Sequence, residues 1–168
     1  MPGNAFIKFA TVAKGEAFQE GHEGSKGWIE IGDWSWDIEA ESSFTKGGGA
    51  AVGKATPGVF SFSHFFDLSS PVIMKNIVKG VHFATVEIEM CKQTGDASGL
   101  PQVYFTIKLV DAFTTKVSTK GGEDGSVNQD VEMVAKSILI TYKPQDNQGK
   151  LGTAIPFEWD IAKNVIVQ

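Results

Sequence analysis

The sequence contains one cysteine, Cys91, among 168 residues, so no disulfide bond can form within the chain. A chain without disulfides is suited to a reducing compartment. It also contains no apolar run approaching the roughly 20 residues that a bilayer-spanning helix needs. The first residues, MPGNAFIKFATV, lack the basic stretch followed by an apolar stretch that marks a signal peptide. We therefore expect a protein that does not insert into a membrane and does not use the ordinary export route.

An excess of basic residues is also missing. The formal net charge is −5, with 21% charged residues. Nucleic-acid binders usually carry a basic patch, so this balance argues against a nucleic-acid partner. The 42% hydrophobic content is enough for a proper core. The length and the absence of a linker or internal repeat predict one domain over residues 1–168.

Most of the chain alternates between apolar and polar residues with a period of two, which is typical of half-buried antiparallel strands. Strands are predicted at residues 4–12, 27–39, 59–66, 81–91, 102–110, 111–118, 130–142 and 153–159. The predicted fold is mainly β, as a small antiparallel barrel or a tight sandwich.

The alternation also predicts which side chains share a face. In residues 59–66, Phe60, Phe62 and Phe66 are expected together, opposite Ser61 and Ser63. In the next two strands, the apolar face is expected to hold Ala84, Val86, Ile88, Met90, Val103, Phe105, Ile107 and Leu109.

One helix is predicted at residues 70–79. Ser69 and Ser70 are candidate N-caps, Pro71 suits the first helical position, and Gly80 suits the end. The apolar stripe of this helix is formed by Ile73, Met74, Ile77 and Val78. Such a helix is expected to close one end of a barrel. Long loops are predicted at residues 42–58, 119–130 and 143–152, and the first is rich in glycine.

Three of the four tryptophans fall in the segment KGWIEIGDWSW, residues 26–36. Trp28, Trp34 and Trp36 lie at even offsets, which share one face in an extended chain. Gly32-Asp33 is a candidate bulge or bend that divides the segment. Because large aromatic residues are mostly buried, a core strand is favoured over an aromatic ligand platform. Trp34 and Trp36 are expected to face the core, with Ser35 on the opposite face.

No catalytic motif is evident. The segment GGAAVGKA, residues 48–55, approaches the phosphate-binding loop, but it follows polar residues, and Thr56-Pro57-Gly58 prevents the helix that such a loop requires. The three histidines lack metal-ligand spacing, and Cys91 is interpreted as a structural thiol. The sequence therefore predicts no enzymatic activity, no cofactor and no metal.

Several segments, taken in order, resemble one family. These segments are AFIKF followed by Gly15-Glu16, KGWIEI followed by WSW, GGGAAVGK, FDLSSPVIMKNIVKGVHF, VSTKGGEDGS, ITYKPQ and FEWDI. Their order and spacing are similar, nearly end to end, to the haemolysin-coregulated protein (Hcp) family, the tube subunit of type VI secretion systems. Val52 and the helix residues Ile73, Met74 and Lys75 depart from the family pattern.

The resemblance implies a small β-barrel with a flanking helix and a long glycine-rich extended loop. It further implies a homohexameric ring, rings that stack into a tube, a spike protein at the tube tip, a contractile sheath, and effector proteins carried in the lumen. Export from the cytoplasm would then proceed through the type VI system without a signal peptide. No effector domain is expected to be fused to the chain.

The resemblance also directs attention to particular residues. We expect Thr45, Lys46, Gly47, Gly48 and Gly49 to contribute to ring stacking, and Ser35 to line the lumen and contact cargo. The alternative function is a monomeric carbohydrate-binding β-sandwich that uses the tryptophans as a sugar platform.

Overall fold

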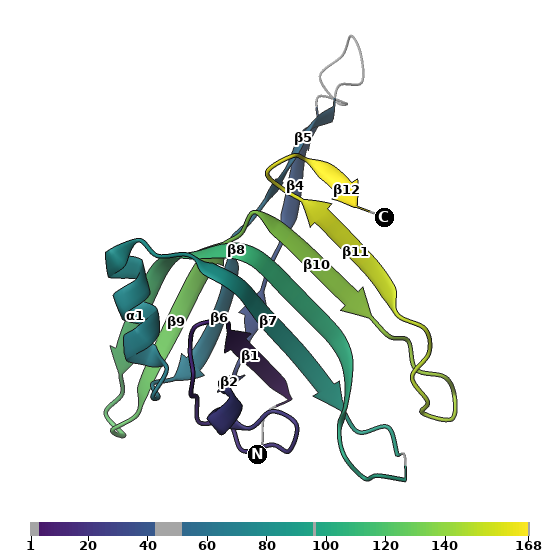
Figure 1. The fold of residues 1–168 in the computed structure, drawn as a ribbon, viewed down its shortest axis with the longest axis horizontal. Helices are drawn as coiled ribbons and strands as arrows, with labels where there is room; N and C mark the ends of the chain where they lie inside the picture. Colours follow the sequence, from purple (N-terminus) through teal and green to yellow (C-terminus); the bar gives the residue numbers. More distant parts are fainter. Residues whose placement is uncertain (1–3, 43–51, 96, 168) are drawn as a thin grey trace.

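The computed structural model of the chain describes residues 4–42, 52–95 and 97–167 (Figure 1). These residues form twelve strands, one α-helix and a short 3-10 helix at Gly24–Lys26. The strands are β1 Ala5–Phe9, β2 Trp28–Ile31, β3 Trp34–Ser35, β4 Ile38–Ser42, β5 Val52–Pro57, β6 Phe60–Phe65, β7 Phe83–Lys92, β8 Gln102–Gly121, β9 Val127–Val134, β10 Ser137–Tyr142, β11 Ile155–Asp160 and β12 Val165–Val167. The helix α1 spans Ser70–Lys79.

The fold class is mainly β, as predicted, and every strand pairing in the described residues is antiparallel. The strand order is β12-β11-β10-β8-β7-β1-β2, and a branch from β8 continues through β9 and β6 to β3. Among the strands that the structure describes, the pairing does not close into a complete barrel. Two backbone bonds join the β2–β3 turn to β6, from Gly32 N to Ser63 O (2.7 Å) and from Ser63 N to Asp33 O (3.0 Å).

The strand β8 is central to this arrangement because it belongs to both branches (Figure 1). The sequence predicted two strands with a boundary at residue 110, whereas the structure has one strand of 20 residues. Asp111 has a φ of 51° at the predicted boundary. The polar residue there changes the backbone direction without ending the strand.

The core lies between the two branches of the sheet, where Ile7, Phe9, Phe60, Phe83 and Ile88 are fully or almost fully buried. The predicted alternation of Phe60 and Phe62 is confirmed, since both are buried. Phe66 is 39% exposed, so its predicted place on the buried face is wrong. It follows the last residue of β6, where the strand period no longer applies.

Two other predicted core positions are wrong. Val103 packs on the opposite side, beside Cys91, because Met90 pairs with Phe105 whereas Cys91 pairs with Val103. The extra residue on β8 is a β-bulge, and it reverses which parity faces the core. Ala84 is exposed near the start of β7, whereas its neighbour Phe83 is buried.

The helix α1 has the predicted boundaries but presents a different face. Gly80, with a φ of 68°, ends it in the left-handed conformation, and its N–H bonds to the carbonyls of Asn76 and Ile77. Ile73 is fully buried, whereas Met74 is 38% and Val78 is 86% exposed. The helix contacts β8 and buries Ile73 in the core, so it flanks the sheet instead of closing a barrel end.

The predicted loop at residues 42–58 is partly a hairpin. The strands β4 and β5 pair from Ile38 with Pro57 to Ser42 with Val52. This hairpin is a separate two-stranded sheet that projects away from the larger sheet in Figure 1, and all five residues of β4 are exposed. The sequence predicted a loop here because the run of glycines and alanines shows no alternation between apolar and polar residues. In the described ranges, no helix is long and apolar enough to cross a membrane.

Candidate functional site

The first candidate surface is the polar face of the branch β3-β6-β9-β8. It carries a row of polar side chains at paired positions, Ser35 with Ser61, Ser61 with Glu132, and Glu132 with Lys116. The hydroxyls of Ser35 and Ser61 lie 2.8 Å apart, and Ser35 is exposed. These side chains face away from the core because strand residues alternate between two faces. A hydrated, hydroxyl-rich surface of this kind suits a wall that faces water.

A second polar row follows on the same face. Ser63 pairs with Asp130, and Asp130 pairs with Ser118. The ammonium group of Lys120 donates to Asp130 over 3.0 Å. Opposite charges at neighbouring positions of a sheet hold each other in place and offer both signs of charge to a ligand. The role of Ser35 in lining a lumen remains a prediction.

The tryptophans of the segment 26–36 separate at Gly32-Asp33. Trp34 packs on the core, and its ring stacks with those of Phe60 (5.9 Å between centroids) and Phe105 (5.6 Å), while its Nε1 donates to the Met90 sulfur over 3.1 Å. Trp36 also packs on the core, against Trp159. The inward orientation of these two residues is confirmed. Trp28 instead lies in a second apolar cluster on the outer face of the sheet, because the chain changes direction between β2 and β3.

The second apolar cluster, Phe6, Ala17, Trp28 and Cys91, covers the outer face of β1, β2 and β7. The loop between β1 and β2 folds over it and is held by backbone bonds such as Gly15 N to Gly24 O (2.8 Å). A Cβ at Gly15 would lie 2.2 Å from the Trp28 carbonyl oxygen. Only glycine permits that close approach. Glycine at position 15 is therefore a steric requirement of this loop.

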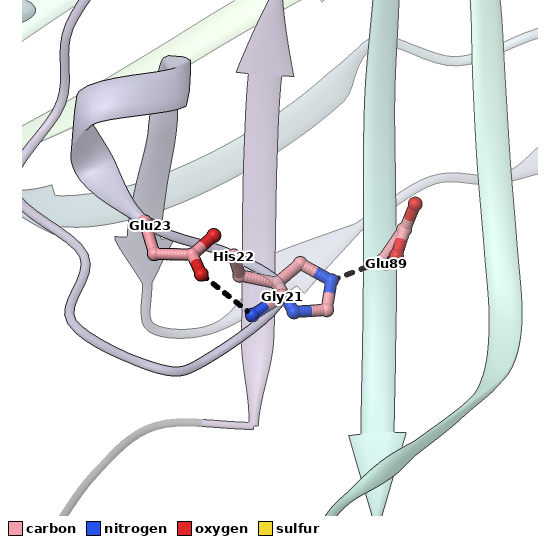
Figure 2. Close-up of polar contacts among 4 residues, drawn as sticks. All are labelled: Gly21, His22, Glu23 and Glu89. Carbon is pink, nitrogen blue, oxygen red and sulfur yellow. Dashed lines mark hydrogen bonds and ion pairs between the residues drawn. The ribbon is translucent and has the colours of Figure 1, made fainter.

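His22 fixes the loop in place (Figure 2). Its ring stacks on Phe6 at 4.5 Å, meets Trp28 edge-on at 4.7 Å, and is 5% exposed. The Nε2 atom donates to the Glu89 carboxylate over 2.7 Å. The sequence analysis found only that His22 lacks metal-ligand spacing, and the structure shows it buried and hydrogen-bonded. Nothing in the sequence around it signals that Glu89, on β7, is its partner.

Two neighbouring groups have shifted pKa values. Hydrogen bonds from backbone N–H groups, its own and that of Gly21, lower the pKa of Glu23, whose Oε1 accepts from Gly21 N over 3.2 Å (Figure 2). Burial raises the pKa of the Cys91 thiol to about 11. A thiol with such a pKa stays protonated near neutral pH, which fits a structural cysteine.

Another candidate surface is an acidic cleft of about 750 Å³ between the β2–β3 turn, the end of β6 and the β8–β9 hairpin. Phe18, Phe65 and Phe66 line it, and Phe18 is 93% and Phe65 is 72% exposed. Five carboxylates line the cleft, those of Glu16, Glu30, Asp33, Asp67 and Asp130, against one lysine, Lys120. No sequence pattern signals this cleft, because its residues come from four separate segments.

The remaining predicted residues are placed as follows. Thr45, Lys46, Gly47, Gly48 and Gly49 lie outside the described residues. The end of the GGAAVGKA segment belongs to β5, so a strand follows the glycines where a phosphate-binding loop requires a helix. The Nε2 atom of His64 lies 2.9 Å from the Gln129 Oε1 atom in a hydrogen bond, and the ring of His82 packs at a tilt against that of Phe113. In the part of the chain that the structure describes, no group of three or more potential ligand side chains gathers to hold a metal.

Comparison with known proteins shows which protein family this chain resembles. The family profile described as "Type VI secretion system effector, Hcp" matches residues 6–144. The chain is 31% identical over 169 residues to "Protein hcp1" of Pseudomonas aeruginosa, covering 98% of this chain and 99% of that protein. The chain is also similar to a solved structure described as "Structure of a type six secretion system protein", with a TM-score of 0.85 and 26% sequence identity. The match covers 97% of this chain and 98% of that one.

A further solved structure, Hcp1 from Salmonella typhimurium, matches with a TM-score of 0.78 and 25% identity, over 99% of this chain and 100% of that one. The fold and these similarities define a structural protein of a secretion system. The chain belongs to the Hcp family of type VI secretion tube proteins.

Proposed function

We propose that this chain is a tube subunit that assembles into hexameric rings, which stack into a tube. The tube is pushed by a contractile sheath, carries a spike protein at its tip and holds effector proteins in its lumen. The protein performs no reaction, and it leaves the cytoplasm as part of the tube. The observation that carries the proposal is the similarity to Hcp1 over nearly the whole of both chains.

Two structural features support the proposal. The β3-β6-β9-β8 face is polar and includes the exposed Ser35, as a lumen wall that releases its cargo would need. The β4–β5 hairpin projects from the larger sheet, where it can reach a neighbouring subunit or the next ring (Figure 1). A ring of identical subunits also requires two different contact surfaces on each copy.

The carbohydrate-binding alternative has less support. A sugar platform needs an exposed tryptophan face, but Trp28 is 7% exposed and the ring of Trp34 is stacked with two phenylalanines. Titration of the protein with simple sugars, monitored by tryptophan fluorescence, tests this alternative directly.

Electron microscopy of the purified protein tests the proposal. Wild-type protein should show six-membered rings, and stacks of rings at high concentration. A variant that lacks residues 45–49 should still form rings but should stack less. Protein that stays monomeric at every concentration would contradict the ring, and unchanged stacking by the deletion variant would contradict the assignment of residues 45–49.

A further inference from the structure

The acidic cleft is the end of the polar β3-β6-β9-β8 face, because Ser63, Lys120 and Asp130 belong to both. Along the sheet this face is balanced in charge. Lys116 lies opposite Glu132 on the neighbouring strand, and Lys120 donates to Asp130. Among the described residues, the cleft lining adds four more carboxylates and no second lysine. The face that the proposed function places in the lumen is therefore acidic at one end.

A buried side chain that lines the cleft lacks a partner at one atom. His64 lines the cleft although its exposed fraction is 4%. Its Nε2 bonds to Oε1 of Gln129, an atom that only accepts, so in the neutral ring Nε2 carries the proton and Nδ1 is an acceptor. Among the described residues, Nδ1 has no hydrogen-bond partner. Buried polar atoms are normally paired, so a donor that enters the cleft fits this position.

The edge of the cleft is apolar and exposed. Phe18 is 93% and Phe65 is 72% exposed. Soluble proteins rarely expose several large apolar side chains together unless a partner covers them. The carboxylates and Nδ1 of His64 are acceptors, and aromatic faces attract cations. The cleft therefore matches a partner that offers positively charged N–H donors beside apolar side chains.

We propose that the acidic cleft binds a basic and apolar segment of the effector that the tube carries. An arginine or lysine side chain would enter among the carboxylates, and neighbouring apolar side chains would cover Phe18 and Phe65. The cleft volume of about 750 Å³ lies within the range of ordinary ligand sites. An acidic segment would be repelled by the same carboxylates. The inference rests on the proposed function and names the chemistry of the cargo.

Peptide binding to the purified full-length chain tests the cleft. The probe is a fluorescently labelled synthetic peptide in which arginine alternates with leucine, and two comparison peptides replace either arginine by glutamate or leucine by serine. Fluorescence anisotropy should show that the wild type binds the arginine–leucine peptide at least about tenfold more tightly than either comparison peptide. Added salt should weaken this binding, because it screens exposed charges. Assembled rings should bind the peptide as tightly as single subunits, since the cleft would open to the lumen.

A double variant assigns the binding to the cleft. Asp33→Asn with Phe65→Ser removes one carboxylate and one aromatic ring, both exposed, so circular dichroism and electron microscopy should show an unchanged fold and unchanged rings. Its affinity for the arginine–leucine peptide should fall about tenfold. The matched control, Glu158→Gln with Val165→Ser, makes the same kinds of change on β11 and β12 and should bind like the wild type.

Three results would overturn the inference. These are equal affinity for the three peptides, full affinity in the variant of Asp33 and Phe65, and rings that fail to bind the peptide while single subunits bind it. In the last case neighbouring copies would cover the cleft. None of these results bears against the tube itself. Protein that binds the arginine–leucine peptide selectively but never forms rings would support the chemistry of the cleft and refute the proposed function instead.

Discussion

The Nε2 atom of His22 lies 2.7 Å from Oε2 of Glu89, although 67 residues separate the two in the sequence. This contact attaches the loop between β1 and β2 to β7, a strand that lies beyond β1 in the sheet. The loop therefore covers the outer apolar cluster as a fixed layer and not as a mobile segment. The contribution of this contact to the free energy of unfolding can be measured.

Replacement of His22 by alanine should lower the free energy of unfolding by about 2–4 kcal/mol, because it removes a ring packed between Phe6 and Trp28 and leaves Glu89 without its donor. Urea denaturation followed by circular dichroism gives the value. The control H82A removes an exposed histidine and should cost less than about 1 kcal/mol. Equal costs for the two substitutions would show that His22 is not an anchor.

Gly15→Ala should destabilise the same loop by about 2–4 kcal/mol, since the added Cβ would lie 2.2 Å from the Trp28 carbonyl oxygen. Gly121→Ala is the matched control. A Cβ there meets no atom within 4 Å, so the free energy of unfolding should stay within about 0.5 kcal/mol of wild type. Thermal unfolding of the two variants, side by side, decides the matter, and a tolerated Gly15→Ala would contradict the steric argument.

Cys91 should make stability depend on pH in the alkaline range. Its pKa is raised from 9.0 to about 11 by burial, so the unfolded chain loses the thiol proton at a lower pH than the folded chain does. The stabilising effect is complete below pH 9 and disappears as the pH rises through about 11. The difference between wild type and Cys91→Ala, measured by urea denaturation from pH 8 to 11, isolates this group from the lysines and tyrosines. A constant difference would contradict the raised pKa.

The same burial should make the Cys91 thiol unreactive. Cys91 is 2% exposed, so a thiol reagent such as DTNB should label the folded protein far more slowly than protein in denaturant. Labelling at equal rates would show that the loop opens freely.

Ser35→Gln should weaken cargo binding without preventing ring formation. The larger side chain would stand in the polar row beside Ser61 and interfere with a ligand that contacts this face. We expect a loss of about tenfold in affinity for an effector that binds in the ring, which corresponds to about 1.4 kcal/mol. Co-purification of effector with rings is the measurement. The control is Thr153→Gln, an exposed position before β11, and equal retention by both variants would remove Ser35 from the lumen.

The sequence predicted the parts of the fold that depend on local periodicity. The alternation around Phe60 and Phe62 identified β6, and Pro71 with Gly80 marked the two ends of α1. These signals are reliable because each arises from the backbone geometry of a few neighbouring residues.

The errors arose where distant residues decide the outcome. A bulge between β7 and β8 moved Val103 to the other face, and a bulge leaves no mark in a single strand's alternation. Met74 and Val78 belong to the apolar stripe of the helix and yet are exposed. Such a stripe shows that one face of a helix is apolar, but it does not show what covers that face. The acidic cleft and the partner of His22 depend on residues from several segments, which no local pattern reveals.

The strand β8 has one further consequence. Its first half pairs with β7 and β10 and its second half with β9, so a single stretch of backbone is shared by both branches of the sheet. Neither branch can melt without withdrawing the same strand from the other. The subunit should therefore unfold in one cooperative transition, and the central amides of β8 should exchange with deuterium only through global opening.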